Sequence, residues 1–240
     1  MKHTKLTFKR YEKKYLLSAD QYDSFRRQLD GYIQPDEYFK STVCSVYYDT
    51  ERFDFIRNSI EAPVYKEKLR VRSYNVPTAD SLVFVELKEK FKGLVYKRRI
   101  AMSAAEAADY LAGRTELADD SQMGREIDWF LHTNDVAPKV FLACDREAYV
   151  GVEDNELRIT FDRDIRWRRE AIQLDAGIWG GRLLLPGQTL MELKLPAAMP
   201  LWLAKTLSRL EIYPASFSKY GRAFCTMLQE TKEKGILLYA

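Results

Sequence analysis

The stretch YKEKLRVRSY, residues 65–74, places a cation at every second position over most of its length. Lys66, Lys68, Arg70 and Arg72 share one parity, and the residues that separate the last three are apolar. Successive side chains of a β-strand point to opposite faces of the sheet. The stretch therefore predicts a strand that carries four cations on one face and an apolar surface on the other.

Charged residues follow the same parity elsewhere in the chain. They are Arg10, Glu12 and Lys14 in FKRYEKKYLL, Glu86 and Lys88 in LVFVELKEK, Arg158 in LRITFD, and Glu192 and Lys194 in LMELKL. A half-exposed antiparallel sheet also alternates apolar and polar residues, and its charged face is then simply hydrated. The recurrence in at least five strands and the prominence of arginine, whose planar guanidinium suits phosphate, favour a charged interior instead.

The expected elements are mainly strands, with helices between strand pairs. Strands are expected at about 5–17, 39–48, 64–74, 82–90, 94–102, 140–150, 157–161 and 190–195, and helices at about 18–29, 50–58, 103–111, 123–132, 200–210 and 218–232. Capping-box patterns begin two of the helices, at Ser18 and Ser103. The glycine-rich segment 163–188 is expected to be a loop with a short hairpin. We predict an α+β fold, an antiparallel β-barrel tunnel with a charged interior and helices packed outside, in a single domain over residues 1–240.

Composition excludes several classes of function. The 240 residues carry a net charge of only +3, so nucleic-acid binding is not indicated. Cys44, Cys144 and Cys225 lie far apart without a CxxC spacing, which argues against a disulfide framework or a cysteine zinc site and favours a reducing cytoplasm. Two histidines, His3 and His132, leave little scope for histidine-based catalysis. We expect a cytoplasmic protein with no signal peptide or membrane segment.

The charge pattern suits the chemistry of phosphate chains. Fixed cations around a cavity bind phosphate through charge-assisted hydrogen bonds. The interspersed glutamates offer hard oxygen ligands for Mg²⁺ or Mn²⁺. Phosphoryl transfer needs mainly positioning and charge neutralisation, so such a tunnel can catalyse it without His, Ser or Cys. The glycines of the segment 163–188 match neither a P-loop nor a dinucleotide fingerprint.

A set of short motifs in a fixed order carries a resemblance to a known family. The motifs are RYEKKY at 10–15, SVYYDT at 45–50, LRVR at 69–72, VELK at 85–88, YKRR at 96–99, REAY at 146–149, LRITFD at 157–162, MELKL at 191–195 and FSKY at 217–220. In this order they resemble the VTC-type polyphosphate polymerase domain of the triphosphate tunnel metalloenzyme (CYTH-like) superfamily. The resemblance covers roughly residues 5–230.

The resemblance implies a metal-assisted transfer of the γ-phosphate of ATP onto polyphosphate, with Mn²⁺ or Mg²⁺ as cofactor. It implies phosphate binding by Arg10, Lys14, Arg70, Arg72, Lys97, Arg99, Arg158 and Ser218, a catalytic role for Lys88, Arg146, Lys194 and Lys219, and metal binding by Glu192, Glu12 and Glu86. Ser218 and Lys219 would close the tunnel over the chain. One departure concerns the first strand, where Arg10 replaces the first glutamate of the superfamily's Glu-x-Glu-x-Lys pattern. This change favours phosphate holding over metal-rich hydrolysis.

Three function classes remain open from the sequence. The first is a polyphosphate polymerase, and the second is a hydrolase of tripolyphosphate or nucleoside triphosphates on the same scaffold. The third is a non-catalytic polyphosphate-binding module, against which Glu192 argues because a pure binder needs no metal ligand. The expected partners are ATP and polyphosphate or another triphosphate, without nucleic acid and with the oligomeric state left open.

Overall fold

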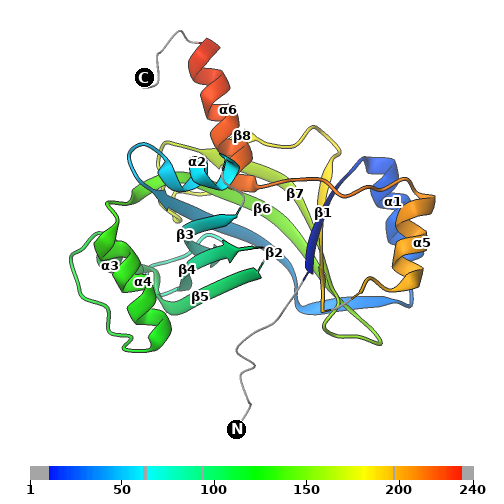
Figure 1. Cartoon of the computed structure of the whole chain (residues 1–240), viewed down its shortest axis with the longest axis horizontal. Helices are drawn as coiled ribbons and strands as arrows, with labels where there is room; N and C mark the ends of the chain where they lie inside the picture. Colours follow the sequence, from blue (N-terminus) through cyan, green and yellow to red (C-terminus); the bar gives the residue numbers. More distant parts are fainter. Residues whose placement is uncertain (1–10, 62–63, 93, 197, 234–240) are drawn as a thin grey trace. The chain divides into compact units, whose positions relative to one another are not determined.

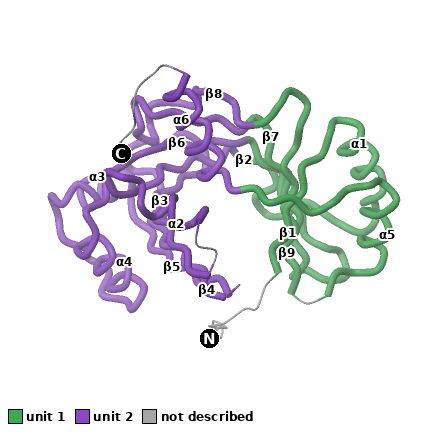
Figure 2. The backbone as a smooth tube through the Cα atoms, turned by 45° about the horizontal axis from the view of Figure 1, so that its top comes forward, with its two compact units in different colours: residues 1–41, 145–164, 184–217 green, residues 42–144, 165–183, 218–240 purple. Residues whose placement is uncertain are grey.

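The computed structural model describes residues 11–61, 64–92, 94–196 and 198–233. Arg10 and the expected strand before Tyr11 lie outside the described residues. The chain forms two compact units, which Figure 2 shows in different colours. Unit 1 comprises residues 1–41, 145–164 and 184–217, and unit 2 comprises residues 42–144, 165–183 and 218–240.

The strands form one sheet of nine strands, in the order β1-β9-β7-β6-β2-β3-β4-β5, with β8 paired to β7. Their bounds are β1 Tyr11–Leu17, β2 Ile33–Asp49, β3 Tyr65–Tyr74, β4 Leu82–Phe91, β5 Leu94–Ser103, β6 Ala137–Gly151, β7 Arg158–Arg168, β8 Gly181–Arg182 and β9 Thr189–Leu195. The strand pairs β1–β9, β2–β3, β3–β4, β4–β5, β7–β8 and β7–β9 are antiparallel. The α+β fold with an antiparallel sheet is therefore confirmed. Within the described ranges β1 and β5 end the strand order, so the sheet does not close into the expected barrel.

Unit 1 packs two helices, α1 (Ala19–Gln28) and α5 (Leu201–Arg209), with the apolar side chains of its strands. Tyr15 and Leu17 of β1 and Leu193 of β9 are almost fully buried in this core. Helix α1 begins at the predicted capping box, in which Ser18 and Gln21 bond each other's backbone N–H groups. Figure 1 shows α1 and α5 beside each other.

Unit 2 has its own core on one face of β3, β4 and β5. Leu69 and Val71 of β3 pack in the same cluster as Ile127 of α4 (Gln122–Thr133). Helix α3 (Ala104–Leu111) begins at the second predicted capping box, Ser103 with Glu106. Helices α2 (Asp54–Glu61) and α6 (Lys219–Glu233) complete this unit (Figure 1). Because one face of the three strands lies in the core, the alternate side chains must occupy the other face.

Strands β2 and β7 extend furthest beyond their expected bounds. Strand β2 begins at Ile33, although Pro35 and Asp36 interrupt the usual strand composition there. Strand β7 continues to Arg168, whose buried guanidinium binds backbone carbonyl groups of the following segment. The short hairpin expected after residue 163 is present, since β8 pairs with β7 through Arg166 and Arg182.

Candidate functional site

The side chains of β3, β4 and β5 that point away from the core of unit 2 form a strongly basic surface. The strand register arranges them in rows. They are Arg72 with Phe84 and Ala101, Arg70 with Glu86 and Arg99, Lys68 with Lys88 and Lys97, and Lys66 with Lys90. We call these side chains the cation face. It holds eight cations and one carboxylate among the described residues of the three strands.

Glu86 lies at the centre of the cation face and is only 1% exposed. Its carboxylate contacts Arg70 at 2.7 Å, Lys97 at 2.7 Å, Arg99 at 3.1 Å and Arg72 at 3.9 Å. Burial acts to raise the pKa of Glu86, but Arg70 and Arg72 outweigh it and hold the pKa well below its ordinary value. One carboxylate thus serves as the counter-ion of four cations, which leaves the face with excess positive charge.

The row of Lys68, Lys88 and Lys97 makes this excess clear. Lys88 lies directly opposite Lys68 on one side and Lys97 on the other. Like charges at directly opposed positions destabilise a sheet. Burial lowers the pKa of Lys97 to about 8, although Glu86 raises it. Such an arrangement costs stability, and a bound anion would relieve the repulsion.

Tyr47 of β2 is a member of the site that the sequence pattern did not single out. Arg70 donates a hydrogen bond from Nη1 to the Tyr47 hydroxyl at 2.9 Å. The buried Tyr47 ring stacks on Tyr220 with 4.7 Å between centroids. Burial acts to raise the pKa of Tyr47, but the positive charges of Arg70 and Arg72 outweigh burial and lower the pKa to about 8. Tyr47 lies opposite Arg70 and has the parity of the cation face, and this parity is the signal that could have identified it.

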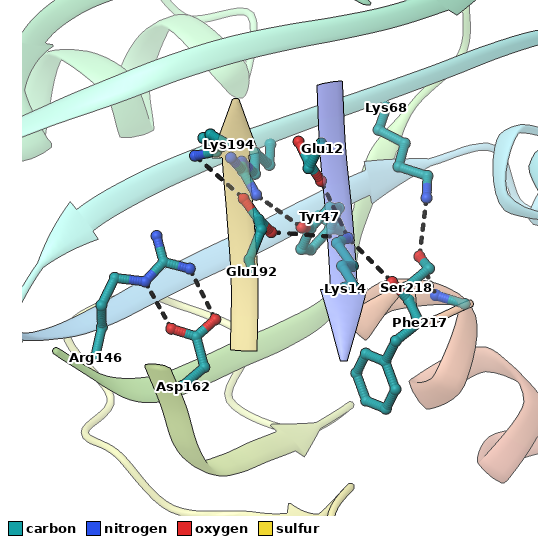
Figure 3. Close-up of polar contacts among 12 residues, drawn as sticks. Glu12, Lys14, Tyr47, Lys68, Arg146, Asp162, Glu192, Lys194, Phe217 and Ser218 are labelled. Atoms are coloured by element: carbon teal, nitrogen blue, oxygen red, sulfur yellow. Dashed lines mark hydrogen bonds and ion pairs between the residues drawn. The ribbon is translucent and has the colours of Figure 1, made fainter. Parts of the chain in front are cut away.

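The beginning of α6 contacts the same region of unit 2. Lys68 donates a hydrogen bond from Nζ to the Ser218 hydroxyl at 3.0 Å, a contact drawn in Figure 3. Tyr220 donates to the buried carboxylate of Asp49 at 2.8 Å, and Asp49 in turn accepts the backbone N–H of Ile56 in α2. These contacts hold Ser218, for which the family resemblance implies phosphate binding, beside a lysine of the cation face. Lys219 is the next residue and is half-buried.

Unit 1 contains a second charged cluster, on the paired strands β1 and β9. Lys14 lies between two carboxylates, 3.3 Å from Glu12 and 3.8 Å from Glu192 (Figure 3). Lys194 lies 3.1 Å from Glu192. The strand register explains the cluster, because Lys14 is opposite Glu192 and Glu12 is opposite Lys194. Lys14 also donates to the backbone carbonyl of Phe217 at 3.0 Å.

The carboxylates of this cluster are the best candidates for holding a metal ion. Mg²⁺ in phosphate-handling sites is usually bound by one or two carboxylates, with substrate oxygens and water completing its shell. Glu12 and Glu192 fit that requirement. The described residues contain no group of three or more His, Cys, Asp or Glu side chains that could hold a metal ion alone. Glu86 fits poorly, because four cations already surround its carboxylate.

Two further predicted arginines of unit 1 are paired with carboxylates. Arg146 donates from Nε and Nη2 to both oxygens of Asp162, at 2.6 Å and 2.7 Å (Figure 3). Asp162 is fully buried, so this bidentate pair fixes the orientation of the Arg146 guanidinium. Arg158 is half-exposed and lies 3.5 Å from Asp36. Pairs between residues so far apart in the sequence could not be deduced from spacing.

Comparison with known proteins identifies the family. The family model of the VTC domain matches residues 9–228, so the chain belongs to the VTC domain family, and the resemblance carried by the motifs is confirmed. No helix in the described part of the chain is long and apolar enough to cross a membrane.

Solved structures of low sequence identity share the fold. A candidate adenylate cyclase from Bacillus halodurans is 15% identical with a TM-score of 0.52, over 86% of this chain and 92% of that chain. A candidate adenylyl cyclase from Hippeastrum, described as having a dominant triphosphatase activity, is 16% identical with a TM-score of 0.51, over 95% of this chain and 96% of that chain. At these identities the similarity establishes the fold alone. No curated protein sequence matches the chain.

Proposed function

We propose that this protein is a polyphosphate polymerase that transfers the γ-phosphate of ATP onto the end of a polyphosphate chain. The observation that carries the proposal is the cation face, which carries eight cations and one carboxylate among the described residues of β3, β4 and β5. Only a ligand with several negative charges would neutralise such a surface. Membership of the VTC domain family over residues 9–228 supports the same substrate class. Since the family match spans both compact units, we propose that they act as one functional domain.

In the proposed reaction a terminal oxygen of the chain attacks the γ-phosphorus of ATP. A new P–O bond forms, the bond to the β-phosphate oxygen breaks, and ADP leaves. The attacking phosphate oxygen is already ionised near neutral pH, so no histidine base is required. Catalysis then depends on positioning and on neutralising charge.

The residues divide these tasks as follows. Arg70, Arg72, Arg99 and Lys97 hold phosphate oxygens, with Glu86 keeping the guanidinium groups aligned. We further propose Lys14, Arg158 and Ser218 as phosphate ligands, and Lys88, Arg146, Lys194 and Lys219 as catalytic residues. Glu12 and Glu192 would hold Mg²⁺ or Mn²⁺, which when bound would neutralise charge on the phosphate oxygens.

A triphosphate hydrolase is the second candidate function. It is favoured by the fold shared with the Hippeastrum protein, for which a dominant triphosphatase activity is described. Water and a phosphate chain end would compete for the same phosphorus atom. The excess of cations over carboxylates on the cation face favours a bound chain end over an activated water molecule. We place either reaction in the cytoplasm, because Cys44, Cys144 and Cys225 are all free thiols.

The product of ATP turnover distinguishes the candidates. Purified protein is incubated with ATP and Mn²⁺ or Mg²⁺, and long-chain polyphosphate, ADP and free phosphate are quantified. The proposal expects polyphosphate, with one ADP released for each phosphate unit added, and loss of both products in Arg70→Ala. Arg114→Ala, an exposed arginine paired with Asp109, serves as the control and should behave as wild type. Free phosphate without polyphosphate would establish the hydrolase, and binding of polyphosphate without turnover would establish a binding module.

A further inference from the structure

An aromatic pair lies at one end of the cation face. Tyr74, at the end of β3, packs edge-on against Phe84 of β4 with 6.1 Å between ring centroids. Phe84 is directly opposite Arg72. On its other side Phe84 faces the small side chain of Ala101. Tyr74 is 43% exposed, so the pair presents aromatic surface to solvent beside the arginines.

The aromatic pair is joined to the arginines by direct contacts. The guanidinium carbon of Arg99 lies 3.5 Å from the centroid of the Phe84 ring. Burial acts to raise the pKa of Tyr74, but Arg72 and a hydrogen bond with Arg99 lower it. Within the described residues, Arg99 Nη2 is buried and has no hydrogen-bond partner. A guanidinium group stacked on Phe84 beside the partly exposed Tyr74 ring is suited to an anion that is attached to an aromatic group.

A second aromatic pair on the same two strands provides an internal comparison. Tyr65 and Phe91 also pack edge-on, with 6.4 Å between centroids, and Tyr65 is 44% exposed. By strand parity they lie on the opposite face, at the other end of β3 and β4. The Tyr65 hydroxyl donates to Glu67 at 2.6 Å and to Glu89 at 3.2 Å. The carboxylates of Glu67 and Glu89 beside this second pair would repel the phosphates of a nucleotide. The guanidinium groups of Arg72 and Arg99 beside the first pair would attract them.

We propose that Tyr74 and Phe84 form the base subsite of a nucleoside triphosphate whose phosphates lie along the cation face from Arg72 towards Lys68. This inference rests on the proposed function, because it gives the orientation of the nucleotide at the same site. Successive rows of the face are two residues apart, or roughly 7 Å along the strand. A triphosphate that begins at Arg72 therefore extends towards Arg70 and Arg99 and on to the lysines. The base, which carries no charge, is left over the aromatic rings, where stacking is favourable.

The test compares the binding of two ligands that differ only in the nucleoside. Dissociation constants of ATP and of inorganic tripolyphosphate are measured by calorimetry in EDTA, which prevents metal-dependent turnover. The variants are Tyr74→Ala, Tyr74→Phe and the matched control Tyr65→Ala. Tyr74→Ala should weaken ATP binding about fivefold to a hundredfold, the range observed for loss of one base–aromatic stack. Its tripolyphosphate affinity should stay within about twofold, and Tyr74→Phe, which keeps the ring, should bind ATP nearly as wild type.

Two results would overturn the subsite. One is an equal loss of ATP and tripolyphosphate affinity in Tyr74→Ala, which would make Tyr74 a support for the arginines. The other is a loss of ATP affinity in Tyr65→Ala as large as that in Tyr74→Ala. Neither result depends on the product formed from ATP. The binding measurements test the base subsite, and the product assay tests the reaction. A hydrolase with a base subsite can therefore be distinguished from a polymerase without one.

Discussion

In unit 2, the buried Arg168 and the arginines of the cation face differ in the acceptors that their guanidinium groups contact. Arg168 is almost fully buried, and its guanidinium donates to backbone carbonyls of the segment that follows, at Glu170, Ala171, Gln173, Gly177 and Trp179. It also lies 3.5 Å from the ring centroid of Phe141. The arginines of the cation face instead share the single carboxylate of Glu86 with a lysine. The structural arginine is thus held by neutral backbone carbonyls, whereas the arginines of the cation face are grouped with a lysine around one carboxylate, where we propose that a ligand binds.

The largest expected effect concerns the structural arginine. Arg168→Ala would leave several backbone carbonyls without donors, and each buried unpaired group costs about 1–3 kcal/mol. We expect the free energy of unfolding to fall by roughly 3 kcal/mol or more, measured by urea denaturation. Arg169→Ala is the control, since its side chain is exposed. Tripolyphosphate affinity of the folded Arg168→Ala protein should be unchanged, and a loss of affinity there would remove the distinction between Arg168 and the arginines of the cation face.

Arg70→Ala should have the converse outcome. Loss of one charge-assisted contact to phosphate is worth roughly 1.5–3 kcal/mol, or about ten- to a hundredfold in tripolyphosphate affinity. Stability should change little, because Glu86 keeps Arg99 and Lys97 as partners and repulsion on the face falls. Calorimetric titration measures the tripolyphosphate affinity, and urea denaturation measures the free energy of unfolding. Destabilisation as large as that in Arg168→Ala, with unchanged affinity, would make Arg70 a structural residue.

Glu86→Gln tests the counter-ion itself. Removing its charge leaves the cations of the face unneutralised, so the ligand-free protein should lose roughly 1.5 kcal/mol of stability. The pKa of Glu86 is lowered in the folded protein, so its contribution is present at neutral pH and is lost only as pH falls below the unfolded value. Tripolyphosphate should raise the melting temperature of this variant more than that of wild type. Glu89→Gln, on the opposite face of the same strand, should show no such difference.

The smallest effect expected is a pH dependence of binding. Lys97 has its pKa lowered to about 8, so it is charged below that pH and becomes neutral above it. Tyr47, with a pKa also about 8, gains negative charge over the same range. Both changes weaken anion binding, so tripolyphosphate affinity should fall about threefold to tenfold as pH rises from 7 to 9. Lys97→Met and Tyr47→Phe should each flatten the profile, and a profile unchanged in both variants would assign it to other groups.

Sequence patterns predicted much of the fold because the relevant signals are local. Parity located the strands, and the capping boxes at Ser18 and Ser103 located two helix starts. The position of Arg70 and Arg72 on one face followed from the two-residue period of a strand. Each of these predictions needs only neighbouring residues.

The remaining features depend on contacts between distant parts of the chain. The row of Lys68, Lys88 and Lys97 depends on the register of two strand pairs, which parity alone does not determine. The bidentate pair of Arg146 and Asp162 joins two different strands. The carbonyls around Arg168 come from an irregular segment whose path has no periodic signal. Metal binding by Glu12 and Glu192, and phosphate binding by the cation face, remain predictions.

We propose that the cation face is maintained for a polyanionic ligand at the expense of stability. The most direct test of this claim is calorimetric titration of tripolyphosphate into wild type and into the double variant Lys88→Met/Lys97→Met, together with urea denaturation of both. We predict at least a tenfold loss of affinity with a stability that rises or changes by less than about 1 kcal/mol. Unchanged affinity in the double variant, with a clear loss of stability, would contradict the claim.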